Sequence, residues 1–397
     1  INENLLSRYD VLFAPDTASY YAKYDVSNGE YLGPALIPFS DDEISNITAW
    51  VKSGGTFIFN AMNLSTVESR NDPVNINNLA RQFGFEFGEV VYAEDQPAPI
   101  ETIPNHILTK GVDTIPFYGT EIKVLSSEVV TLAKYENYPV VVARFYLSDT
   151  GTGMVLGLGT NFVFDNWAMT GGYTGVAYVS VWNFTRNIVE FAKNSRDLRL
   201  VLPDQINGQV YDLDFYSPYA INYTIVKDSE GELKLMPKKV GDNHYSIKYA
   251  PRTTGNQLFE AQLFEEFVTD NEVEYYYLTV TKVFKANAAY NDQTNPEIIV
   301  VSVTPSSPNE FDSIKLAINV SDDTWVTEVE INYKGRTYNA EYNMEDGLWY
   351  VELPSAGIGS FSINAKIIAH DAFGNIGELG YNISLTPIYT ISIIGVI

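Results

Sequence analysis

The sequence contains no cysteine and only three histidines among its 397 residues. Without cysteine the chain cannot form disulfides, thiolate metal sites or a cysteine nucleophile, although this absence leaves the compartment open. The three histidines, His106, His244 and His370, lie far apart, so their spacing indicates neither a zinc site nor a serine–histidine–acid triad. We expect His106 to be structural, the other two to occupy solvated strand positions, and the chain not to be an enzyme.

Positive charge is also scarce. The chain has 25 lysines and arginines against 50 aspartates and glutamates, which gives a formal charge of −25. Such a surface repels nucleic acid and anionic lipid, and no strong basic patch interrupts it. The partners we expect are therefore other proteins, further copies of this chain or glycans, the last suggested by 28 tyrosines.

Nucleotide-binding and hydrolase motifs are missing as well. The chain has no P-loop and no GxSxG elbow, and its short glycine motifs at 151–153 and 157–159 flank an apolar strand instead of opening a helix. We interpret them as turns, and we expect no organic cofactor.

The two ends of the sequence suggest its context. It starts at Ile1 without an initiator methionine or a signal-peptide pattern, so we expect a processed chain or a piece of a longer one. Residues 387–397 form an uncharged apolar tail of about half the length that a membrane-spanning helix needs. This tail is either a last strand or the start of a C-terminal membrane anchor.

Residues 1–195 alternate between short apolar strands and helix patterns, which is typical of an α/β domain. Tyr9–Ala14 is predicted as a buried strand, a capping box at Ser40–Glu43 starts a helix, and Thr56–Asn60 is predicted as a central strand. The other expected elements are a helix at 74–82, strands at 140–145 and 154–158, and a closing helix with Val181, Phe184, Ile188 and Phe191 on its apolar face. The expected fold is Rossmann-like or flavodoxin-like with a mainly parallel sheet.

Beyond residue 196 the hydrophobic pattern changes to strict alternation, which indicates half-buried strands. We predict one all-β sandwich over 197–290 and, after a polar linker, an immunoglobulin-like sandwich over 294–386 with about seven strands. Trp349 is predicted to lie in the core of the second sandwich.

Calcium is the one metal that the sequence supports. Asp322 and Asp323 follow an early strand of the last module, while Asp371, Asn375 and Glu378 lie in or just after a later turn. Oxygen ligands on loops at one end of a module are what Ca²⁺ prefers. The alternative is that these are ordinary turn residues, because aspartate and asparagine favour tight turns without any ion.

Sequons for N-glycosylation are as frequent as chance predicts in a chain this rich in asparagine, serine and threonine. The predicted acceptors, of which Asn222 and Asn319 fall on outward-facing strand positions, are Asn46, Asn63, Asn183, Asn222, Asn319 and Asn382.

Residues 1–195 resemble the class I glutamine-amidotransferase-like domains, through segments 9–13, 49–59, 105–112 and 153–159. The resemblance is to a non-catalytic branch found in intraflagellar transport proteins and behind the protease domain of some large subtilases. The family places its cysteine nucleophile on an elbow after a central strand, where this chain has Ala61-Met62-Asn63. The family's chemistry therefore does not carry over, and the fold's first strand and helix are expected to be missing before Ile1.

Residues 294–386 resemble the immunoglobulin or fibronectin type III-like modules of prokaryotic, especially archaeal, surface proteins, and the turn at 371–375 is typical of them. Together these observations predict a non-enzymatic extracellular or cell-surface protein, membrane-bound only through its tail, that acts in binding, adhesion or surface-layer assembly. The alternatives are the C-terminal accessory region of a secreted subtilisin-like protease and a carbohydrate-binding protein.

Overall fold

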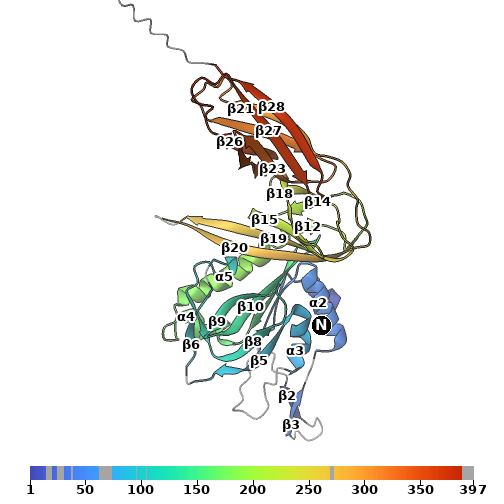
Figure 1. The fold of residues 1–397 in the computed structure, drawn as a ribbon. Helices are drawn as coiled ribbons and strands as arrows, with labels where there is room; N and C mark the ends of the chain where they lie inside the picture. The colour runs from blue at the N-terminus through green and yellow to red at the C-terminus, as the bar shows by residue number, and fades with distance from the viewer. Residues whose placement is uncertain are drawn as a thin grey trace, which may run out of the picture. The chain divides into compact units, whose positions relative to one another are not determined.

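The computed structural model describes residues 1–14, 20–24, 31–36, 39–61, 74–94, 96–103, 105–268 and 272–386 (Figure 1). The chain divides into two compact units. Unit 1 comprises residues 1–202, 216–222 and 260–282, and unit 2 comprises 203–215, 223–259 and 283–397. The apolar tail at 387–397 and the acceptor Asn63 lie outside the described residues.

The segment 197–290, which we expected to form a sandwich of its own, is divided between the two units. Four strands contribute residues to both units. They are β14 (Tyr211–Tyr216), β15 (Ala220–Asp228), β19 (Gly255–Val268) and β20 (Val273–Ala286).

The central sheet of unit 1 is mixed. Strands β1 (Val11–Ala14), β4 (Thr56–Asn60) and β11 (Thr152–Leu158) run parallel to each other, whereas β10 (Tyr138–Leu147) is antiparallel to β11 and to β9 (Val130–Tyr135). The predicted parallel arrangement therefore holds for β1, β4 and β11 but not for β10 with β9 and β11. The connections on either side of β10 are short, whereas parallel neighbours require a crossover of a dozen or more residues.

Helices cover both faces of this sheet. Helices α2 (Asp41–Lys52) and α3 (Val74–Ala80) pack on one face, where Phe57 and Phe59 of β4 join their core. Helix α5 (Tyr178–Asn194) lies on the other face (Figure 1). Its Phe191 contacts Phe145 of β10. Side chains of a strand alternate between faces, so β10 supplies Val142 to the first core and Phe145 to the second.

Local predictions for unit 1 are largely confirmed. The capping box of α2 forms with Ser40 and Glu43, β4 is buried throughout, and α5 buries the predicted apolar stripe. Strand β1 was expected to be buried, but it lies at the sheet edge with Val11 and Phe13 36% and 39% exposed. An edge strand has a hydrogen-bonded neighbour on one side only, so its other side lacks a strand to cover it.

Shorter elements complete unit 1. They are α1 (Glu3–Leu6), β2 (Tyr20–Tyr24), β3 (Tyr31–Leu36), η1 (Arg81–Phe83), β5 (Phe85–Tyr92), β6 (Ala98–Glu101), η2 (Ile107–Thr109), β7 (Thr114–Phe117), β8 (Gly119–Val124), η3 (Phe162–Phe164), α4 (Asn166–Thr170) and β12 (Arg199–Val201).

Unit 2 is all β. In its first part β13 (Gln205–Ile206) pairs with β20, β15 pairs with β16 (Gly231–Leu235), and β14, β18 and β17 are consecutive strands of a separate four-stranded sheet. The bounds of this sheet are β14 (Tyr211–Tyr216), β18 (His244–Tyr249) and β17 (Lys238–Gly241).

The last eight strands of unit 2 form two four-stranded sheets, in the orders β21-β22-β26-β25 and β24-β23-β27-β28. These orders correspond to the ABED and CFG sheets of an immunoglobulin-like sandwich with one added strand. Trp349 is 5% exposed in the core between them, as predicted. The strands are β21 (Glu297–Thr304), β22 (Ile314–Ser321), β23 (Val326–Tyr333), β24 (Arg336–Asn339), β25 (Glu341–Asn343), β26 (Leu348–Leu353), β27 (Ser362–Asp371) and β28 (Ile376–Ser384).

Within the part of the chain that the structure describes, no helix combines the length and the apolar character needed to cross a membrane.

Candidate ligand-binding site

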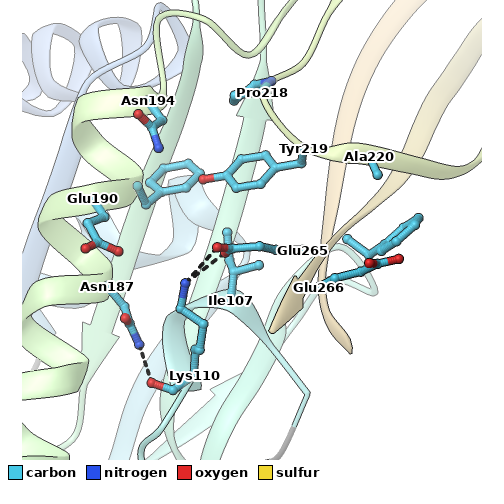
Figure 2. Close-up of a pocket in the computed structure, with 12 residues that line it drawn as sticks. Ile107, Lys110, Asn187, Glu190, Asn194, Pro218, Tyr219, Ala220, Glu265 and Glu266 are labelled. Atoms are coloured by element: carbon cyan, nitrogen blue, oxygen red, sulfur yellow. Dashed lines mark hydrogen bonds and ion pairs between the residues drawn. The ribbon is translucent and has the colours of Figure 1, made fainter. Parts of the chain in front are cut away.

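A pocket of about 380 Å³ lies in unit 1 against helix α5 (Figure 2). One wall is a face of the helix, and the others come from the end of η2, the loop before β15 and strand β19. The lining residues are Ile107, Lys110, Asn187, Glu190, Phe191, Asn194, Pro218, Tyr219, Ala220, Phe264, Glu265 and Glu266. A volume of this size falls within the range of small-ligand sites in proteins.

An ion pair forms part of the pocket wall. The Nζ atom of Lys110 donates to Oε1 of Glu265 at 3.0 Å and to Oε2 at 2.9 Å. The Lys110 side chain is 13% exposed and that of Glu265 40% exposed. The pair therefore neutralises both charges and leaves one N–H of the ammonium for another acceptor.

Asn187 is the most deeply buried polar residue of this wall. Its Nδ2 donates to the carbonyl oxygens of Leu108 and Lys110, at 3.1 and 2.8 Å, which fixes the orientation of the amide. Its Oδ1 is buried and has no hydrogen-bond partner among the described residues. A buried acceptor without a donor costs roughly 1–3 kcal/mol, which the packing around the amide must offset.

Tyr219 closes the pocket on the side of the loop. Ser217, which is buried, accepts from the Tyr219 N–H at 3.1 Å and donates to its carbonyl oxygen at 2.8 Å, so the loop is held in a tight turn. Burial raises the pKa of Tyr219 to about 12, while a hydrogen bond from Asn194 opposes the shift. The phenol therefore stays neutral at ordinary pH.

Comparisons with known proteins leave the family open. No protein-family model matches the chain, and no curated protein matches it. Solved structures that match include the full Ig1–Ig3 ectodomain of mouse nectin-like molecule 4, at 14% identity and a TM-score of 0.19, over 48% of this chain and 65% of that one. The tandem Ig repeats of Dlar match at 8% identity and a TM-score of 0.15, over 48% and 97%. These scores carry no argument, so the immunoglobulin-like description rests on strand order.

His106 lies in unit 1 and meets none of the requirements of a catalytic triad. The residue is 8% exposed, and its ring packs against Phe145 and accepts a hydrogen bond at Nδ1 from the Leu108 N–H at 3.1 Å. Its Nε2 is buried and unpartnered within the described residues, with neither a serine nor a carboxylate bound to the ring. Burial lowers the pKa of His106 to about 4, which keeps the imidazole neutral.

The other two histidines lie in unit 2. His244 is not simply solvated as predicted, because its Nε2 lies 2.8 Å from Oδ1 of Asp214 and the ring is partly buried. His370 is partly exposed on β27.

The structure brings together only part of the predicted calcium set. Asp322 and Asp323 meet Asp292, and one ligand oxygen from each of the three lies within 4.8 Å of the others. Glu378 instead pairs with Lys366 at 2.8 Å, because both lie on outward positions of adjacent strands. The prediction of one calcium site formed by all five of these residues is therefore wrong.

Asp371 and Asn375 serve the turn between β27 and β28. Asp371 accepts from the backbone N–H groups of Phe373 and Asn375 at 2.8 Å and from the Asn375 amide at 2.7 Å. This is the alternative that the sequence left open, in which these residues form a turn without an ion.

The Asp292 cluster is electrostatically strained. Asp292 is buried, and its two oxygens accept from Thr294 and Thr324. Burial raises the pKa of Asp322, and the charges of Asp292 and Asp323 add to the shift. Asp322 Oδ2 is buried with no hydrogen-bond partner in the described part of the chain. A cation would offset the repulsion among the three carboxylates and would give the unpaired oxygen of Asp322 a partner.

The described sequon asparagines differ in accessibility. Asn222 and Asn382 are exposed on strands, whereas Asn46, Asn183 and Asn319 are partly buried. The Asn183 amide also donates to the Gly111 carbonyl at 2.7 Å. Glycosylation stays a prediction, and Asn222 and Asn382 are its most accessible acceptors.

Proposed function

We propose that this chain is a non-enzymatic protein of the cell exterior that works by binding. Unit 1 would hold a small polar ligand in the α5 pocket, and the β modules of unit 2 would serve as spacers or as contacts to other proteins. The observation that carries the proposal is the pocket itself, whose wall combines the Lys110–Glu265 ion pair with apolar side chains such as Ile107 and Phe191.

The chemistry of the pocket supports binding over catalysis. Lys110 Nζ donates to both carboxylate oxygens of Glu265, so the lysine is occupied by an ion pair, and Tyr219 keeps its proton at ordinary pH. Catalysis requires an activated nucleophile, a metal or a tuned acid–base pair, and these lining groups supply none of them.

A ligand screen with a blocked pocket tests the proposal. Ala220 is exposed at the pocket, so Ala220→Trp should fill the entrance without disturbing the core. Ligands at about ten times their dissociation constant should stabilise the wild type by roughly 1.4 kcal/mol and raise its melting temperature by a few degrees. The variant should show no such rise.

Val201→Trp is the matched control, because Val201 is 45% exposed in unit 1 and does not line the pocket. A screen of sugars, amines, amino acids and small acids in which no ligand stabilises the wild type would contradict the proposal. Turnover of amide or ester substrates by the isolated chain would contradict it as well.

Carbohydrate binding is a second candidate, favoured by exposed aromatic rings near α4 and α5. Trp167, Tyr178 and Trp182 are each more than half exposed, and Trp182 Nε1 is fixed by a hydrogen bond to the Met169 carbonyl oxygen at 2.9 Å. Such rings offer large, rigid contact area to the apolar face of a sugar. Trp167→Ala/Trp182→Ala should abolish retardation in polysaccharide affinity gels, whereas Tyr138→Ala, a change at an exposed ring on β10, should not.

We also propose Ca²⁺ as a structural cofactor of unit 2. Asp292, Asp322 and Asp323 supply the hard oxygen ligands that this ion prefers, and the buried Oδ2 of Asp322 lacks any other partner among the described residues.

A further inference from the structure

We infer that one end of the last sandwich binds the surface of a lipid bilayer, with apolar loop side chains entering the headgroup region. This surface, here called the apolar tip, is formed by residues 305–313, 334–336 and 354–361 of unit 2. The inference goes beyond the proposed function, because it involves neither the α5 pocket nor the calcium cluster.

The first argument is a group of large apolar side chains that the loops of the tip leave exposed. Phe311, Ile358 and Phe361 are 56%, 86% and 61% exposed. Their loops are bound to each other, since the Gly357 N–H donates to the Glu310 carbonyl oxygen at 2.9 Å. The three side chains therefore gather at one end of the module, and gathered exposed apolar groups mark an interaction surface.

The second argument is charge, which changes sign at the tip. Lys334 and Arg336 are exposed in the hairpin between β23 and β24, and Lys334 Nζ donates to the Ala356 carbonyl oxygen. The carboxylates of the three tip segments are Glu310, which is 4% exposed, and Asp312, which is partly buried. In a chain with a formal charge of −25 the exposed charge of this end is therefore mainly positive, which suits the phosphate groups of lipids.

The third argument is the place from which the sequence continues. The Thr386 N–H donates to the Pro308 carbonyl oxygen at 2.8 Å, so the last described residue lies at the tip. Residues 387–397, which follow it, are uncharged and mainly apolar. An apolar centre with basic side chains beside it, followed by such a sequence, favours a lipid surface over a soluble acidic partner.

A second copy of the chain fits the tip less well. A symmetric contact between two tips would bring the same surface of each chain together, so Lys334 and Arg336 would face their own counterparts. Like charges beside an apolar contact oppose association, whereas lipid phosphates neutralise them.

The acidic cluster of the same module lies away from this surface. Strand β22 starts next to the tip at Ile314 and ends at Ser321, one residue before Asp322. Eight residues of strand span about 26 Å, which exceeds the screening length of about 8 Å at physiological salt. The carboxylates of the cluster therefore do not repel lipid phosphates at the tip.

Flotation of the full chain with phosphatidylcholine vesicles, with and without added phosphatidylglycerol, tests the inference. We expect the wild type to bind and Phe311→Ser/Ile358→Ser to weaken binding at least about tenfold, because two apolar side chains no longer leave water. Both positions are exposed in loops, so the variant should fold. Phe267→Ser/Val268→Ser, at positions of β19 that are 44% and 72% exposed in unit 1, is the matched control and should bind like the wild type.

Charge is tested on the vesicles that contain phosphatidylglycerol. Arg336→Gln should weaken binding by about fivefold, as expected for one basic residue near an anionic surface. Arg186→Gln, at an arginine whose side chain is 59% exposed on α5, is the charge-matched control and should leave binding unchanged.

A fluorescent label reports whether the tip itself enters the lipid. The chain has no cysteine, so Ser307→Cys and Ser321→Cys each supply a single labelling site, and both serines are exposed. Ser307 belongs to the tip and Ser321 to the other end of β22. On vesicles the emission of an environment-sensitive dye at 307 should shift to shorter wavelength, while that of the same dye at 321 should not change.

Three results would overturn the inference. The first is no vesicle binding by the wild type. The second is binding that Phe311→Ser/Ile358→Ser leaves unchanged, or during which the dye at 307 stays in water, because the chain would then attach through residues 387–397 or another segment. The third is self-association that the double variant abolishes while vesicles are not bound, which would assign the tip to a second copy. None of these results affects the α5 pocket.

Discussion

Lys110 and Glu265, which lie 155 residues apart in the sequence, form a two-point ion pair at 2.9 and 3.0 Å. Glu265 belongs to the part of β19 that is counted in unit 1, so the ion pair links this strand to the loop after η2 within the same unit. The same loop is held from the other side by Asn187, which donates to the Lys110 carbonyl oxygen.

We predict that Glu265→Gln lowers the free energy of unfolding of unit 1 by about 1–2 kcal/mol, because the ammonium of Lys110 is mostly buried and would lose its counter-charge. Urea-induced unfolding at low salt measures the change. Lys110→Met combined with Glu265→Gln should recover part of the loss, since no buried charge then remains. A double variant as unstable as the sum of the single variants would contradict this account.

Acid sensitivity should arise from His106. Its pKa is lowered to about 4 by burial, so above pH 6.5 the ring is neutral in both the folded and unfolded states. As the pH falls from 6.5 to 4 the unfolded chain takes up a proton that the folded chain does not, and roughly 3 kcal/mol of stability is lost. Thermal unfolding at pH 7.5 and 4.5 measures the loss.

His106→Asn keeps an acceptor near Nδ1 for the Leu108 N–H but cannot titrate, so it should reduce the drop in melting temperature between these two pH values. His370→Asn, a change at a partly exposed ring in unit 2, should leave the drop unchanged. If the melting temperature falls equally in the wild type and in His106→Asn, other groups control the loss of stability in acid.

The sequence predicted the features that depend on neighbouring residues. The capping box of Ser40 and Glu43, the apolar stripe of α5 and the alternating strands of the last module all appear as expected, because periodicity and capping act over a few residues. Strand pairing is non-local. Strand β1 has the apolar composition of a central strand, yet only the arrangement of the sheet makes it an edge.

The pocket was not predicted because its residues come from four separate segments. One signal was present, since Asn187 lies next to Ile188 inside the apolar stripe of α5, and a buried amide within such a stripe is a candidate for a specific contact. The calcium prediction missed Asp292 for a related reason. The segment around it was taken as a polar linker, and only the fold places it against Asp322 and Asp323.

Gly153 is expected to be irreplaceable. A Cβ atom at this position of β11 would lie 1.6 Å from the carbonyl oxygen of Val51 in α2, so the helix could not keep its place on the sheet. Gly153→Ala should destabilise unit 1 by more than about 2 kcal/mol or prevent folding, as forced overpacking does. Gly380→Ala, where nothing lies within 4 Å of the added atom, should leave the melting temperature within the usual range of surface substitutions.

Calcium should stabilise unit 2. Binding only to the folded state raises stability with the logarithm of ligand concentration, so millimolar Ca²⁺ should raise the melting temperature of unit 2 by several degrees if the dissociation constant is about 0.1 mM. Asp323→Asn removes one ligand at the surface of the cluster and should abolish most of the increase. Glu378→Gln should keep it, because Glu378 pairs with Lys366 instead of joining the cluster.

The same cluster gives calcium stabilisation a defined pH dependence. The pKa of Asp322 is raised in the folded state, chiefly by burial and further by the charges of Asp292 and Asp323. Without calcium, protonation of Asp322 as the pH falls favours the folded state, because the folded chain holds that proton more tightly than the unfolded one. With calcium the proton competes for a ligand oxygen, so the calcium-dependent increase in melting temperature should shrink on acidification and be largest near neutral pH. A calcium response that is absent at pH 7, or equally large in Asp323→Asn, would show that these three carboxylates do not form a calcium site.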